Sequence, residues 1–141
     1  FPVEPINLGR HAHPLSADGT IPHMPGWRWI HTPGHTPGHV SLFRDSDRAL
    51  IAGDAFVTVK QESIYKVFAQ EAEISGPPRY FTPDWPAARE SVNKLQALHP
   101  ELAVTGHGMP LAGKKLADGL QRLVEDFDRI ALPNEGKYVK Q

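Results

Sequence analysis

The amino-acid sequence predicts an α/β domain in which helices pack as a layer on a sheet. Short apolar runs bounded by turn residues fill much of positions 27–53, which is the pattern of β-strands. Two longer segments, 85–98 and 116–130, carry apolar residues at helical spacing instead. The chain has 141 residues, enough for one domain of ordinary size, so we expect a single domain over residues 1–141.

The first 26 residues are predicted to form an irregular connecting segment with short strands. They contain five prolines and little hydrophobic periodicity. Asp18-Gly19 is a turn signal, and it predicts short strands on either side of the turn. His11 and His13 are interpreted as surface histidines of such a strand rather than as metal ligands.

Three strands are predicted after this segment. Residues 27–31 alternate, so one face collects three side chains, Trp27, Trp29 and His31. Residues 39–44 and 49–53 are apolar runs separated by the polar turn 45–47, and they predict a buried β-hairpin. Residues 57–81 are ambiguous, with one or two helical turns as one interpretation.

The two helical segments have recognisable ends. Thr82 is a natural N-cap, Pro83 suits the first helical position, and His99-Pro100 ends this helix. Residues 102–105 then predict a short strand that runs into a glycine-flanked histidine. The last helix is predicted to continue to Leu132-Pro133.

The composition narrows the possible functions. The formal net charge is −1, so the charge balance gives no indication of nucleic acid or a membrane surface as a partner. The chain has no cysteine, which excludes disulfides and thiolate ligands and fits a cytoplasmic protein. No run approaches the roughly 20 apolar residues that a membrane-spanning helix needs.

Three polar side chains stand where predicted strands meet glycine-containing turns, namely His35, Asp54 and His107. A carboxylate that leaves a buried strand is costly unless it is paired or coordinated. Two imidazoles and a carboxylate suit Zn²⁺, and Mn²⁺ or Fe is also compatible with them. We therefore expect the three side chains to converge at one edge of the sheet.

The order of these motifs resembles the metallo-β-lactamase superfamily, particularly its glyoxalase II-like branch. "TPGHTPGH" is similar to the family's third ligand motif, "GDAF" to its bridging-aspartate motif and "TGHG" to its final-histidine motif. The resemblance implies that His35 ligates a first metal, His107 ligates a second, and Asp54 bridges both as a catalytic residue. It also implies hydrolysis by a metal-bound hydroxide, with two zinc ions per complete protein.

The resemblance starts at about Trp27 and departs from the family pattern before that point. The family's first motif, His-x-His-x-Asp-His, is absent, although "HAHPLS" at 11–16 contains a His-x-His. The implied fold is therefore half of a four-layer αββα sandwich, with one mixed sheet and helices on its outer face. We expect the chain to represent the C-terminal half, with low metal occupancy and no activity alone.

Two further histidines share the regular spacing of four residues with His35. By this spacing His39 has the pattern of a ligand, but the resemblance implies that it supports the site through bonds to nearby backbone. His31 is interpreted as an inward-facing strand residue near the site.

The favoured function is a metal-dependent hydrolase acting on an ester, thioester, lactone or similar bond of a small molecule. The alternative is a metal-free α/β module that assembles with itself or with a partner. A nuclease of the same superfamily is less favoured, because no basic face is visible. If the chain is half of the sandwich, no second sheet covers its inner sheet face. This predicts a homodimer through that face, with four candidate residues, Val40, Leu42, Leu50 and Ala52.

Overall fold

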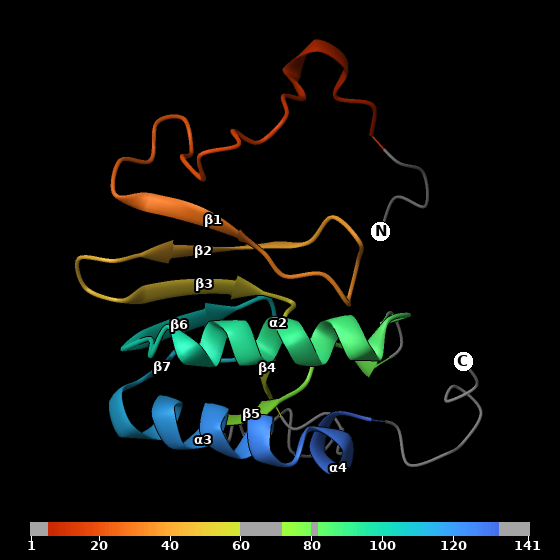
Figure 1. The fold of residues 1–141 in the computed structure, drawn as a ribbon, viewed down its shortest axis with the longest axis vertical. Helices are drawn as coiled ribbons and strands as arrows, with labels where there is room; N and C mark the ends of the chain where they lie inside the picture. The colour runs from red at the N-terminus through yellow and green to blue at the C-terminus, as the bar shows by residue number, and fades with distance from the viewer. Residues whose placement is uncertain (1–5, 60–71, 80–81, 133–141) are drawn as a thin grey trace.

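The computed structural model describes residues 6–59, 72–79 and 82–132. Its main sheet has five strands in the order β1-β2-β3-β6-β7 (Figure 1). Strands β3 and β6 run parallel, whereas the other neighbouring pairs are antiparallel, so the predicted mixed sheet is confirmed. The strands are Trp27–His31 (β1), Val40–Arg44 (β2), Ala49–Gly53 (β3), Leu102–Thr105 (β6) and Leu111–Ala112 (β7).

A second, two-stranded sheet pairs β4 (Val57–Val59) with β5 (Ala72–Ser75). It occupies part of the region that the sequence left ambiguous. The helical turns considered there fall in 60–71, outside the described residues. The helices are η1, a 3-10 helix at Gly9–His11, and the α-helices α2 (Trp85–Ala97), α3 (Gly113–Glu125) and α4 (Phe127–Ala131).

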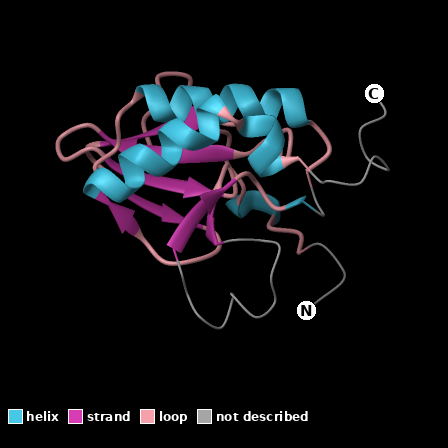
Figure 2. Cartoon of the chain, turned by 90° about the horizontal axis from the view of Figure 1, so that it is seen from below, coloured by secondary structure: helices cyan, strands magenta, loops and turns pink. Residues whose placement is uncertain are grey.

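The long helices lie together on one side of the strands (Figure 2), as predicted. Phe43 is the register partner of Leu50, and Leu50 is the partner of Ala103, so these three side chains share one face. They are buried in one cluster with four helix residues, Val92, Leu95, Leu116 and Leu120. Burial of side chains of this size contributes about 1.5–3 kcal/mol each to folding. Among the described residues, no helix is long and apolar enough to cross a bilayer.

The opposite face of the sheet carries apolar side chains that remain exposed. Leu42, Ile51 and Val104 are register partners across β2, β3 and β6, so they form one row on this face. Ile51 is 38% exposed, and Val104 and Leu102 are each 41% exposed. We call Leu42, Ile51, Leu102 and Val104 the open apolar face.

Two of the four residues predicted for this face lie on it. Val40 and Leu42 alternate with the helix-facing Phe43 and therefore point to the open side. The prediction was wrong for Leu50 and Ala52, which are 1% and 0% exposed and belong to the core beneath the helices. Partners across a hairpin share a face, and the observed register pairs Leu50 with Phe43 rather than with Leu42.

Helix α2 begins later than predicted. Asp84, rather than Thr82, is its N-cap, because the Asp84 carboxylate accepts a hydrogen bond from the Ala87 N–H at 3.0 Å. Pro86, rather than Pro83, occupies the first turn, where a proline costs no helical hydrogen bond. The Thr82 hydroxyl therefore does not cap α2, and it donates to the Pro78 carbonyl oxygen instead.

The last helical segment is broken, contrary to the single helix predicted. Asp126 separates α3 from α4 with φ −131° and ψ 38°, outside the helical region. After the break, Phe127 and Ala131 are both buried. Ala131 packs so closely on Gly76 that any Cβ at that glycine would collide with it.

The N-terminal segment extends away from the main sheet, beyond β1 (Figure 1). In its described part, residues 6–26, a 3-10 helix and turns replace the predicted short strands, and an isolated bridge joins Thr20 to Arg28. His11 ends η1, so its assignment to a strand was wrong, whereas the predicted exposure of His11 and His13 is confirmed.

Candidate metal centre

His35 lies in the loop between β1 and β2, and this loop is held against α2. Gly34 has φ 138°, and it lies so close to helix α2 that a Cβ added to it would be 2.5 Å from the Cα of Ala88. The Ser91 hydroxyl donates to the Pro33 carbonyl oxygen at 2.7 Å. Helix packing therefore fixes the backbone on which the His35 imidazole stands.

Asp54 and His107 follow two neighbouring parallel strands. Because β3 and β6 are parallel and adjacent, the residues after their C-terminal ends meet at one edge of the sheet. The Gly106 N–H donates to the Gly53 carbonyl oxygen at 2.8 Å, which ties the two loops together. Position 106 requires glycine, since a Cβ there would collide with the Asp54 carboxylate.

The three predicted side chains converge, as the sequence led us to expect. His35 Nε2 lies 3.4 Å from Asp54 Oδ2, and His107 Nε2 lies 3.5 Å from Asp54 Oδ1. The His35 side chain is 15% exposed, whereas that of His107 is 60% exposed. The carboxylate thus presents one oxygen to each imidazole, at an edge that is closed on the His35 side and open on the His107 side.

The Asp54 carboxylate has an unsatisfied oxygen. Asp54 Oδ1 is buried and has no hydrogen-bond partner. Leaving a buried acceptor unpaired costs about 1–3 kcal/mol, and such an atom in a native structure calls for an explanation. A cation held by Asp54 and a histidine would supply the missing partner, so the residues present fit a metal. Within the described part of the chain, no group of three or more His, Cys, Asp or Glu side chains is arranged so that it could hold a metal ion by itself.

His39 supports Asp54 through the backbone. Its Nε2 accepts the Asp54 N–H at 3.0 Å, and its Nδ1 lies 3.1 Å from the Thr32 carbonyl oxygen. A nitrogen that accepts must be unprotonated, so Nδ1 carries the hydrogen and donates to Thr32. Burial lowers the pKa of His39, which favours this neutral ring. The backbone contacts predicted for His39 are confirmed.

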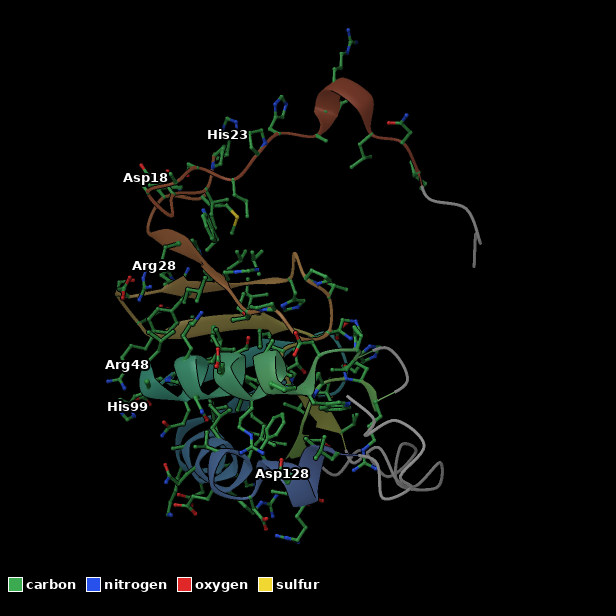
Figure 3. All side chains as sticks on the ribbon, turned by 45° about the vertical axis from the view of Figure 1, so that its right-hand side comes forward. Asp18, His23, Arg28, Arg48, His99 and Asp128 are labelled. Carbon is green, nitrogen blue, oxygen red and sulfur yellow. The ribbon has the colours of Figure 1, made fainter. Side chains whose placement is uncertain are left out.

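Two further histidines, His31 and His23, are not among the three converging side chains. His31 is exposed, with Nε2 2.8 Å from the Pro37 carbonyl oxygen, so the prediction that it faces inward was wrong. The reason is its place as the last residue of β1, where alternation turns it away from buried Ile30. Figure 3 shows His23 on the N-terminal segment, beyond the β1 edge of the sheet.

Two buried threonines behind the centre were missed by the sequence analysis. Thr82 Oγ1 lies 3.4 Å from His35 Nδ1 and donates to the Pro78 carbonyl oxygen at 2.7 Å. Thr58, in β4, donates to the Met109 carbonyl oxygen at 2.6 Å, two residues beyond His107. Thr82 was noticed only as a helix cap, and Thr58 carries no motif that could have signalled its position.

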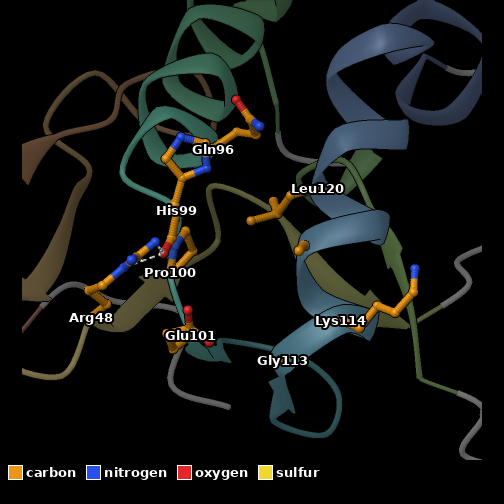
Figure 4. A pocket seen from close by; sticks show the side chains of 9 residues that line it. Arg48, Gln96, His99, Pro100, Glu101, Gly113, Lys114 and Leu120 are labelled. Carbon is orange, nitrogen blue, oxygen red and sulfur yellow. Dashed lines mark hydrogen bonds between the residues drawn. The ribbon is translucent and has the colours of Figure 1, made fainter.

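A pocket of about 420 Å³ lies at the other end of the main sheet (Figure 4). Its lining includes Arg48, which precedes β3, and Glu101, which precedes β6. Arg48 Nε donates to the His99 carbonyl oxygen at 2.7 Å along one side of it. Since Asp54 and His107 follow the C-terminal ends of the same strands, this pocket is separate from the candidate metal centre.

Comparison with known sequences identifies a family and relatives. Residues 4–107 match the model of the metallo-beta-lactamase superfamily. The chain is 48% identical over 130 residues to the probable metallo-hydrolase YflN of Bacillus subtilis, covering 92% of the chain and 49% of the relative. It is 31% identical over 114 residues to a hydroxyacylglutathione hydrolase of Rhodopseudomonas palustris, covering 80% and 36%. The chain thus spans half or less of the length of these relatives.

Solved structures support the same fold. The structure of TTHA1623 in a di-iron-bound form matches with a TM-score of 0.51 and 22% identity, over 90% of this chain and 49% of that one. A metallo beta lactamase from Erythrobacter litoralis matches with a TM-score of 0.50 and 19% identity, over 83% and 49%. At these identities the likeness concerns the fold alone.

Proposed function

This chain belongs to the metallo-beta-lactamase superfamily, and from that premise we propose that it supplies one side of a dinuclear metal centre to a hydrolase. The observation that carries the proposal is the Asp54 carboxylate, which lies between two imidazoles and whose buried Oδ1 has no hydrogen-bond partner. Relatives named as metallo-hydrolase and hydroxyacylglutathione hydrolase support a hydrolytic reaction.

The proposed ligands are His35 for one metal, His107 for the other, and Asp54 shared between them. Each imidazole directs Nε2 to a different oxygen of the carboxylate, which is the arrangement a bridging ligand requires. Nitrogen and carboxylate oxygen donors favour Zn²⁺, with Mn²⁺ or Fe as alternatives. When bound, such ions supply an activated water and polarise the bond to be cleaved.

The residues of this chain position that chemistry. His39 holds the Asp54 backbone, so the carboxylate is fixed at the edge of the sheet. The loop of His35 is locked on α2, whereas the exposed His107 ring borders the solvent side, where substrate would enter. We propose an ester, thioester or lactone of a small molecule as substrate, because one polarised carbonyl is common to all three.

We further propose that the chain does not catalyse this reaction alone. A catalytic zinc usually has three protein ligands and one open position, whereas here each metal would have one histidine and a shared aspartate. A chelator-sensitive hydrolysis of a thioester at a rate near that of a complete relative would contradict this proposal.

The proposed metal centre is tested by zinc binding to the 141-residue chain. After equilibrium dialysis against micromolar to millimolar Zn²⁺, we expect wild-type protein to retain zinc and Asp54→Asn to lose most of it. Asp118→Asn removes a carboxylate from an exposed α3 ion pair and serves as the matched control. Equal zinc retention by Asp54→Asn and wild type would refute the assignment.

The open apolar face favours a second property, self-association. We propose that a second copy of the chain covers this face when no other sheet does, giving a homodimer. Ile51, Leu102 and Val104 are each more than a third exposed, although apolar side chains in a central sheet are normally buried. Sedimentation at micromolar concentration tests this proposal, and a monomer at all concentrations would contradict it.

A further inference from the structure

Thr58 lies behind the candidate metal centre and belongs to none of its motifs. We propose that Thr58 is a positioning residue, which sets His107 at the correct place beside Asp54. This inference rests on the proposed metal centre and extends it to a residue with no ligand chemistry of its own. The strand that contains Thr58, β4, is part of the second sheet and reaches the His107 loop from outside the main sheet.

The contacts of Thr58 with this loop are short and buried. Thr58 is 1% exposed, and its backbone N–H donates to the His107 carbonyl oxygen at 3.1 Å. Its hydroxyl donates to the Met109 carbonyl oxygen at 2.6 Å, so Thr58 bonds the residues on both sides of Gly108. A parallel β-bridge between Thr58 and Gly108 completes the junction.

The backbone of His107 is therefore held by several bonds that converge on its carbonyl oxygen. Besides the Thr58 N–H, the Thr105 hydroxyl donates to that oxygen at 2.7 Å. The two hydroxyls, of Thr58 and Thr105, lie 3.1 Å apart. The His107 ring itself is mostly exposed, and its Nε2 lies 3.5 Å from Asp54 Oδ1. Because few contacts with the described residues hold the ring, its position depends on the backbone that Thr58 fixes.

The backbone of Gly108 packs closely against Thr58. Gly108 has φ 103°, and a Cβ there would collide with the Thr58 hydroxyl and backbone. Thr58 also lies only four residues beyond Asp54, so one short segment carries the carboxylate and the clamp on His107. Thr58 thereby connects the loops of two proposed ligands. Groups bonded directly to a ligating side chain change metal affinity about 10–100-fold when removed, and Thr58, which bonds the backbone of the loop, should act at the lower end of that range.

A purely structural role would also make Thr58 sensitive to mutation, so the test must separate metal affinity from stability. Thr58→Val keeps the shape and removes the hydroxyl, whereas Thr58→Ser retains the hydroxyl. The matched control is Ser75→Ala, which removes a buried hydroxyl bonded at 2.8 Å to the carbonyl of Val59, one residue from Thr58. If Thr58→Val does not fold, Thr105→Val replaces it, because it removes the other hydroxyl that donates to the His107 carbonyl oxygen.

The experiment is a Co²⁺ titration of the full 141-residue chain, followed through the ring C–H resonances of its histidines, with urea unfolding in chelator as the stability measurement. We expect Thr58→Val to weaken Co²⁺ binding about tenfold and to shift the His107 resonance in the metal-free protein. Thr58→Ser should restore both. Ser75→Ala should lower stability while leaving the Co²⁺ affinity within about twofold of wild type.

Unchanged Co²⁺ affinity and an unmoved His107 resonance in Thr58→Val would overturn the proposal. An equal loss of affinity in Ser75→Ala would overturn it too, since the effect would then follow stability. Absence of Co²⁺ binding in wild type would refute the proposed metal centre instead. In that case the metal-free His107 resonance still decides whether Thr58 positions the ring.

Discussion

Replacing Asp54 with asparagine should stabilise the metal-free chain while removing its response to metal. The carboxylate carries a buried oxygen without a hydrogen-bond partner, and burying an unpaired charged oxygen costs more than burying the neutral amide that replaces it, by about 1–3 kcal/mol. The side chain is 26% exposed, so we take the lower end of that range. The Asp54 N–H bond to His39 is a backbone interaction and is retained.

The expected gain is therefore about 1 kcal/mol, or a melting temperature about 3–5 °C higher for a chain of this size. The assay is thermal unfolding in the presence of a chelator, with wild type and variant compared in the same buffer. Added Zn²⁺ should reverse the order, because a ligand that binds only the folded state stabilises wild type and not the variant.

The reasoning fails if Asp54→Asn is less stable than wild type in chelator, because the carboxylate would then be satisfied in solution. It also fails if Zn²⁺ raises the melting temperature of both proteins equally. Asp118→Asn, the exposed control, should show neither effect.

Three further predictions follow from particular contacts. Asp84→Ala should lower the free energy of unfolding by about 1 kcal/mol in urea titrations, because it removes the α2 N-cap; no change would contradict the cap assignment. Ile51→Lys should abolish concentration-dependent sedimentation, whereas Leu15→Lys, a change at an exposed residue outside the sheet, should not. The hydrogen bond from Arg28 lowers the pKa of the Asp45 carboxyl from its ordinary value of 3.8. The pair therefore stabilises the fold fully above pH 3.8, and this stabilisation is lost as the pH falls through the lowered pKa. Asp45→Asn should therefore reduce the acid dependence of the melting temperature slightly, and an unchanged dependence would contradict it.

Local patterns in the sequence predicted much of the fold. The alternation in 27–31 and the apolar runs at 39–44 and 49–53 are properties of neighbouring residues, and the strands form where these patterns are. The helix ending before His99-Pro100 follows from the restriction that proline places on the preceding residue. Motif order also placed His35, Asp54 and His107 at one edge, and their contacts with each other are present.

Features that depend on distant contacts were not predictable in the same way. Thr82 and Asp84 are both good N-caps, and the choice between them depends on where α2 meets the His35 loop. The break at Asp126 depends on how Phe127 and Ala131 pack, and Ala131 fits only because position 76 is glycine. The role of Thr58 depends on a bridge to a loop 50 residues away along the chain.

The central claim is that His35, Asp54 and His107 bind metal together, and a Zn²⁺ titration followed by histidine ring resonances tests it most directly. We predict that the resonances of His35 and His107 change together and saturate, that Asp54→Asn abolishes both changes, and that exposed His31 is unaffected. Perturbation of His31 or the N-terminal His11 at lower Zn²⁺ concentrations, with His35 and His107 unchanged, would contradict the account.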